Sequence, residues 1–209
     1  KDLEIRGAGN LLGGEQSGHI ADVGFDLYMR MVGDAVNEYK RGVIDGVIEN
    51  IECKVELPIT AHLSAEYVPS DRLRLDLYRR LADARESGDI DAIRDELIDR
   101  FGPLPPESER LIHVARLRNY VKSHGITDFA VQGKYVKVAP LAPSESLELK
   151  IQRLYPGSIV KSVTKVVLIA RPQTAAWEAG DTADEIGDTS LLDWATELAE
   201  TLLERPIRK

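Results

Sequence analysis

The sequence predicts a fold of the α+β type within the broad α/β class, with helices and strands in separate stretches of the chain. Two observations predict it. Apolar residues recur at helical spacing in three successive segments between residues 70 and 124, and the period then shortens towards two between residues 129 and 170. A loop and a helix precede these elements, and a further helix ends the chain.

The first 19 residues form a glycine-rich segment. Its glycines are too frequent for a regular helix or strand, and they permit positive φ angles; they are Gly7, Gly9, Gly13, Gly14 and Gly18. From residue 22 to 41 apolar side chains recur at helical spacing, and Gly42 is placed to end that helix. We expect a structured loop and an amphipathic helix here, and assign residues 1–48 to this unit.

Residues 49–171 are expected to form a second unit. Residues 43–68 contain short apolar pieces interrupted by Pro58, which indicates an extended connector or an edge strand. Asp89 is placed to cap a helix, while Gly102 and Gly125 are placed to end helices. The spacing therefore predicts three helices, over residues 70–84, 89–101 and 106–124.

Two strand pairs around a short helix complete this unit. Residues 129–131 and 136–138 flank a Gly133-Lys134 turn, which fits a hairpin. A helix over 144–155 follows, and then strands over 159–163 and 165–170. The second of these strands is apolar enough to be buried on both faces.

The C-terminal part of the chain is strongly acidic. Residues 172–187 have the composition of an acidic linker or insertion, and residues 188–209 contain a last helix over 188–204, with Trp194 expected in the core. Residues 173–204 hold nine acids and no Lys or Arg, so the rest of the chain is nearly neutral within a net charge of −8. This balance argues against a free-standing electrostatic binder of nucleic acid.

Metal, redox and membrane roles find no support. Cys53 is the single cysteine, and no CxxC or paired-histidine spacing accompanies it, so neither a disulfide nor a zinc site is expected. His113 is expected to be a core or boundary residue rather than a ligand. The longest apolar run is far too short to span a bilayer. We expect a chain of the reducing cytoplasm, and its start without Met is typical of a piece of a longer protein.

One acidic cluster has two interpretations. It could serve as a metal or general acid/base site, but its spacing fits the solvated face of an amphipathic helix, interleaved with Arg94 and Arg100. Its members are Asp89, Asp91, Asp95, Glu96 and Asp99. The spacing favours the solvated face, so we predict no catalytic and no metal-binding residue.

The glycine-rich loop does not fit a nucleotide site. Leu12 stands where a dinucleotide fingerprint requires glycine, and no Gly-Lys-Ser/Thr occurs. The loop is then either a structural turn or a device that presents Arg6 and Gln16 to a backbone phosphate or a neighbouring domain.

Longer motifs carry a resemblance to a known family. The stretch DLEIRGAGNLLGGEQSGHI at residues 2–20, with VGFDLY at 23–28, closely resembles the end of the helicase module of the bacterial transcription-repair coupling factor family, Mfd, and less closely that of the RecG helicases. The motifs that resemble the Mfd C-terminal domain are LRLDLYRRLA, ELIDRFGPLP and ARLR, at residues 73–82, 96–105 and 115–118. The resemblance covers about residues 1–170, and the last helix more loosely.

The resemblance implies a parent protein that is an ATP-dependent DNA translocase. It would couple transcription to nucleotide excision repair by displacing stalled RNA polymerase and recruiting UvrA. Arg6 and Gln16 match the arginine and glutamine that couple ATP-driven movement to stepping on duplex DNA. The ATPase motifs are not in this sequence, so ATP and Mg belong to the parent, and this chain should neither bind a cofactor nor hydrolyse ATP.

The resemblance also implies a regulatory role for the second unit. In the family, this domain packs on the N-terminal module that resembles UvrB, masks the surface that recruits UvrA, and restrains translocation until RNA polymerase is engaged. The acidic segment 172–187 looks like an insertion relative to the family pattern. The alternative function is a free-standing nucleic-acid-binding module that uses the glycine-rich loop, and tight, salt-dependent duplex binding would favour it.

Overall fold

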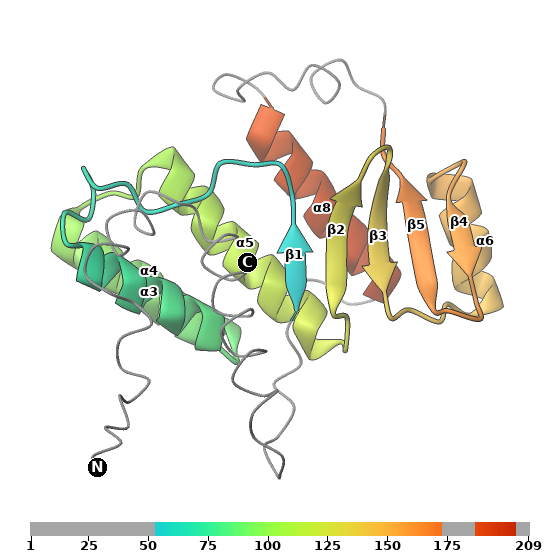
Figure 1. Cartoon of the computed structure of the whole chain (residues 1–209), viewed down its shortest axis with the longest axis horizontal. Helices are drawn as coiled ribbons and strands as arrows, with labels where there is room; N and C mark the ends of the chain where they lie inside the picture. Colours follow the sequence, from blue (N-terminus) through green and yellow to red (C-terminus); the bar gives the residue numbers. More distant parts are fainter. Residues whose placement is uncertain (1–52, 173–186, 204–209) are drawn as a thin grey trace, which may run out of the picture.

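A computed structural model describes residues 53–172 and 187–203 (Figure 1). The expected N-terminal loop and helix, and the acidic segment from 173 to 186, lie outside the described residues. Within the described part, helices accompany a mixed five-stranded sheet, and three successive helices separate its first strand from the rest, so the predicted α+β fold class is confirmed.

Three successive helices form, as the periodicity predicts. They are α3 (Asp71–Asp83), α4 (Ser87–Phe101) and α5 (Pro106–Ser123). Ser70 caps α3, since its side chain accepts a hydrogen bond from the amide of Leu73. Helix α4 begins earlier than predicted, because Glu86 is its N-cap and Asp89 supplies the returning carboxylate of a capping box. Gly102 ends α4 with φ of 86°.

Both predicted hairpins form, and they merge into one sheet. The strands are β1 (Lys54–Glu56), β2 (Asp128–Gln132), β3 (Tyr135–Ala139), β4 (Ile159–Lys161) and β5 (Val166–Ala170). Their order is β1-β2-β3-β5-β4, with α6 (Glu145–Leu154) between the two hairpins in sequence. The antiparallel β3–β5 pair joins the hairpins, and β1 lies parallel to β2. The predicted edge strand is therefore β1.

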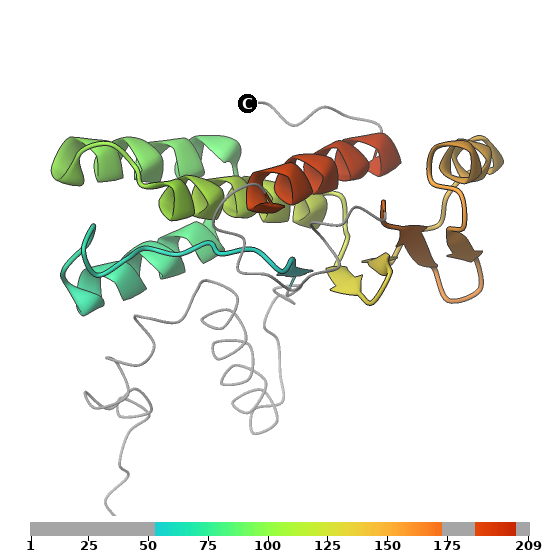
Figure 2. The same cartoon turned by 90° about the horizontal axis from the view of Figure 1, so that it is seen from above.

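The core lies between the sheet and the helices. Figure 2 shows α5, α6 and α8 (Gly187–Leu203) on the same side of the sheet. In β5 only the alternate residues Val167 and Ile169 are buried, so the prediction that this strand is buried on both faces is wrong. The physical reason is that β5 belongs to an antiparallel part of the sheet. One face of such a sheet packs on the helices, and the other face stays half-exposed. Leu198 of α8 is fully buried, while Trp194 is half-buried with its ring edge-to-face against Tyr155.

Candidate interaction surface on helices α3, α4 and α5

The connector from residue 57 to 70 holds the helices in place through backbone groups. The buried hydroxyl of Tyr78, on α3, accepts a hydrogen bond of 2.8 Å from the amide of Leu63. On α5, the hydroxyl of Ser108 donates to the carbonyl of His62, which also belongs to the connector, at 3.1 Å. Because polar groups on the helices satisfy backbone groups of the connector, the connector and the helices have fixed relative positions.

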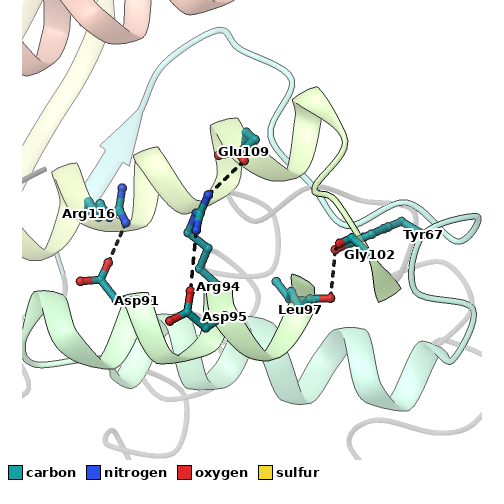
Figure 3. Close-up of polar contacts among 8 residues, drawn as sticks. All are labelled: Tyr67, Asp91, Arg94, Asp95, Leu97, Gly102, Glu109 and Arg116. Carbon is teal, nitrogen blue, oxygen red and sulfur yellow. Dashed lines mark hydrogen bonds and ion pairs between the residues drawn. The ribbon is translucent and has the colours of Figure 1, made fainter. Parts of the chain in front are cut away.

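Tyr67 fixes the C-terminal end of α4. Its hydroxyl lies 2.8 Å from the carbonyl oxygen of Gly102 and 3.1 Å from that of Leu97 (Figure 3). Its ring packs edge-to-face on Phe101, with 5.8 Å between centroids. Burial, followed by the nearby charge of Glu109, raises the pKa of Tyr67, so the hydroxyl keeps its proton for donation.

Ion pairs lie on the outer surface of α3, α4 and α5. We call the α4 charged face the set Arg80, Asp91, Arg94, Asp95, Glu96, Asp99, Arg100, Glu109 and Arg116. On the side towards α5, Arg116 lies 2.6 Å from Asp91, and Arg94 lies between Asp95 at 3.7 Å and Glu109 at 3.6 Å (Figure 3). These contacts join α4 to α5 through charges that remain partly exposed to water.

On the side towards α3, one carboxylate binds two arginines. Glu96 accepts hydrogen bonds from Arg80 of α3 at 2.7 Å and from Arg100 of its own helix at 2.8 Å. The Arg80 contact, with that of Arg100, holds the pKa of Glu96 below its usual range, and the same contact raises the pKa of Arg80. Glu96 is therefore ionised throughout the neutral range.

This arrangement favours the solvated-face interpretation of the acidic cluster. Four of its five residues are exposed, and three of the five are paired with arginines. Within residues 53–172 and 187–203, no three His, Cys, Asp or Glu side chains lie close enough to hold a metal ion. Asp99 has no ion-pair partner among the described residues. Exposed ion pairs exchange partners at little cost, so this face is suited to reversible, salt-sensitive docking.

The other candidates behave as structural residues. Cys53 is buried, and desolvation raises the pKa of its thiol to about 11, which makes it a poor nucleophile. His113 is half-buried, with Nε2 3.2 Å from the Thr196 hydroxyl of α8, so it is a boundary residue between two helices. None of the described helices has the length and apolarity that a membrane crossing requires.

The predicted loop residues lie outside the described residues. Arg6, Gln16 and the glycines around them therefore remain predictions. Sequence reasoning named Arg94 and Arg100 beside the acids but missed the arginines that reach α4 from other helices. Arg100 stands four residues after Glu96 and could have been paired from spacing alone, whereas Arg80 and Arg116 reach α4 from other helices and give no local signal.

Sequence comparisons find known proteins that are similar to this chain. Residues 57–149 match the family model described as the TRCF domain. A transcription-repair-coupling factor of Mycobacterium bovis is 42% identical over 99% of this chain, and one of Staphylococcus haemolyticus is 40% identical over 66%. The chain spans only 17% and 12% of the length of these relatives.

A solved structure shares the fold. It is described as the C-terminal domain of a transcription-repair coupling factor, and it aligns with a TM-score of 0.54 at 15% sequence identity. The alignment covers 73% of this chain and 92% of the solved one. At this identity the likeness shows the fold alone.

Proposed function

The chain belongs to the transcription-repair coupling factor family, and we propose that it is the C-terminal part of an ATP-dependent DNA translocase. The 42% identity along almost the whole chain carries this proposal. The parent would displace stalled RNA polymerase and recruit UvrA, so that transcription is coupled to nucleotide excision repair in the cytoplasm. ATP and Mg would bind to the parent outside this chain, which would not hydrolyse ATP itself.

Residues 1–48 would couple ATP hydrolysis to movement on duplex DNA. In this proposal the glycine-rich loop presents Arg6 and Gln16, and the arginine supplies a planar set of donors for phosphate oxygens. Arg6→Ala in the parent protein should uncouple ATP hydrolysis from displacement of polymerase without unfolding the chain. Normal displacement by this variant would remove the role.

Residues 49–171 would act as an autoinhibitory domain. We assign the contact with the UvrB-like N-terminal module to the α4 charged face, because its partly exposed ion pairs come from three helices that the connector holds in fixed positions. Such a contact can be weak and still remain closed, since both partners belong to one parent chain and have a high effective concentration. Polymerase binding would then shift the population towards the open state.

Calorimetric titration of this chain into the separately expressed UvrB-like module tests the proposal. We expect saturable binding that weakens between low and moderate salt and is displaced by UvrA. Asp99→Lys should weaken binding, because Asp99 is exposed and unpaired within the described residues. Glu145→Lys, an equal charge reversal on the exposed start of α6, is the matched control and should bind normally.

Two outcomes would contradict this assignment. Equal weakening by both charge reversals would mean that only net charge matters and that the α4 charged face is not the contact. Tight, salt-dependent binding of the chain to duplex DNA, without binding to the module, would favour the nucleic-acid-binding alternative.

A further inference from the structure

Exposed apolar side chains gather at one end of the domain. Among the described residues, all the large apolar side chains with high exposure lie between residues 149 and 163, with accessible fractions from 41% to 99%: Leu149, Leu154, Ile159 and Val163. This stretch runs from the second half of α6 through β4 into the turn before β5. We call residues 149–165 the outer edge unit. Figure 1 shows it at the far side of the domain from α3 and α4.

The backbone of the sheet is open at the same place. Strand β4 is the last in the order β1-β2-β3-β5-β4 and pairs only with β5 among the described strands. The opposite edge differs, because β1 is flanked by the buried residues Cys53 and Leu57 and its start is held by Arg118. An open strand edge offers unpaired amide and carbonyl groups to a further strand.

The charges of the outer edge unit are cationic and have no ion-pair partner in the described part of the chain. Its basic residues make no ion pair with any described residue, in contrast to the arginines of the α4 charged face; they are Lys150, Arg153, Lys161 and Lys165. The acids of α6, Glu145 and Glu148, lie in its first turn, outside the unit. Among residues 53–172 and 187–203, the unit therefore holds four cations without an ion pair, in a chain whose net charge is −8.

These observations together select one kind of partner. We propose that the outer edge unit binds an extended segment of another protein that carries carboxylates among apolar residues and adds to the sheet as a strand beside β4. Main-chain hydrogen bonds would provide affinity, while Ile159 and Val163 would contact the apolar residues of the segment. A lysine on an edge strand discourages uncharged strands from pairing, so Lys161 would select for acidic ones.

The charge and the apolar residues of the outer edge unit also argue against two other partners. A second copy of this chain would place two cationic edges side by side, which is unfavourable. Nucleic acid would engage the cations but leave the strand edge and the apolar side chains without a role. The unit lies away from the α4 charged face, so this proposal does not depend on the autoinhibitory contact.

Selection from a phage-displayed library of random peptides on the immobilised full chain tests the proposal. We expect enriched peptides with acidic and apolar residues in alternation. The double variant Lys161→Glu, Val163→Asp should bind them at least about tenfold more weakly. Both positions are exposed, so folding should be preserved, and circular dichroism checks this. Arg72→Glu, an exposed charge reversal on α3, is the matched control and should bind as the unchanged chain does.

Methylation of peptide nitrogens tests the strand geometry. In a strand, alternate amides point towards and away from β4, so N-methylation should abolish binding at every second position and leave the others nearly unchanged. Uniform tolerance of methylation would overturn the proposal. So would enrichment of no peptide, enrichment of peptides without acids, or equal binding to the double variant. The chain could instead associate with itself or bind duplex DNA. If the double variant abolished either activity and the Arg72→Glu control did not, the unit would belong to that partner, and the proposal would be overturned.

Discussion

Replacement of Glu96 by Gln should weaken the contact between α3 and α4 while keeping the shape of the side chain. The carboxylate of Glu96 lies 2.7 Å from Arg80 and 2.8 Å from Arg100, so the change removes one charge from two ion pairs. The Glu96 side chain is 29% exposed and those of the arginines 40% and 45%, which means that water screens both pairs substantially.

A double-mutant cycle separates the two pairs. For Glu96 with Arg80 we expect a coupling of about 0.5–1 kcal/mol, since the pair joins two helices and is partly buried. For Glu96 with Arg100, four residues apart on one helix, we expect about 0.3–0.5 kcal/mol. Both couplings should fall as ionic strength rises from about 0.1 M to about 1 M. Arg79 and Asp83, 3.7 Å apart and largely exposed, provide a control cycle with a smaller coupling.

The dependence on pH has a definite sign. Because the pKa of Glu96 is lowered on folding, its charge adds stability that is fully present above the ordinary value of 4.5 and is lost as pH falls through the lowered pKa. Urea unfolding of the chain and of Glu96→Gln should therefore differ at neutral pH and converge in acid. A difference that persists below the lowered pKa of Glu96, or a coupling that does not fall with rising salt, would refute the reasoning.

Three further predictions concern the interior. Tyr78→Phe should cost about 1–3 kcal/mol in urea unfolding, because the buried amide of Leu63 loses its acceptor. The thiol of Cys53 should react with a disulfide reagent at neutral pH at least about a hundredfold more slowly than a small thiol, since its pKa of about 11 lies well above the ordinary 9.0. Leu198→Ala should cost about 2–5 kcal/mol in the same unfolding assay, because it leaves a cavity beneath α8.

Each of these predictions has a control. Tyr135→Phe, whose half-exposed hydroxyl has no hydrogen bond within the described residues, should change stability by less than about 0.5 kcal/mol. Asp193→Ala on the exposed side of α8 should be similarly mild. Rapid reaction of Cys53 in the folded chain would show that the thiol is accessible. Equal losses for Leu198→Ala and Asp193→Ala would show that α8 does not pack as described.

Local patterns predicted most of the elements. The helices α3 and α5 and both hairpins follow from periodicity and from the Gly133-Lys134 turn. The start of α4 was displaced because Asp89 and Glu86 form a reciprocal capping box, in which either acid resembles a cap when read alone. The joining of the hairpins through β3 and β5 has no local signal, since it depends on how the whole sheet packs.

The candidate surface was predictable only in part. The helical spacing identified the acids of α4 as a solvated face, and this remains the best description of Asp91 and Asp95. It could not identify Arg80 as the partner of Glu96 or Arg116 as the partner of Asp91, because those contacts depend on the crossing of three helices. Nor could it show that four cations at the other end of the domain lack ion-pair partners among the described residues, because pairing is a property of the folded surface.

The parallel pairing of β1 with β2 has a consequence for the order of folding during synthesis. Lys54 pairs with Asp128, and the chain between them forms α3, α4 and α5. A ribosome therefore releases β1 long before its neighbour exists, and the strand must wait while three helices assemble through local contacts. During that interval the apolar residues Val55 and Leu57 have no sheet to enter. We expect hydrogen exchange during refolding to protect the helices first and β1 among the last elements.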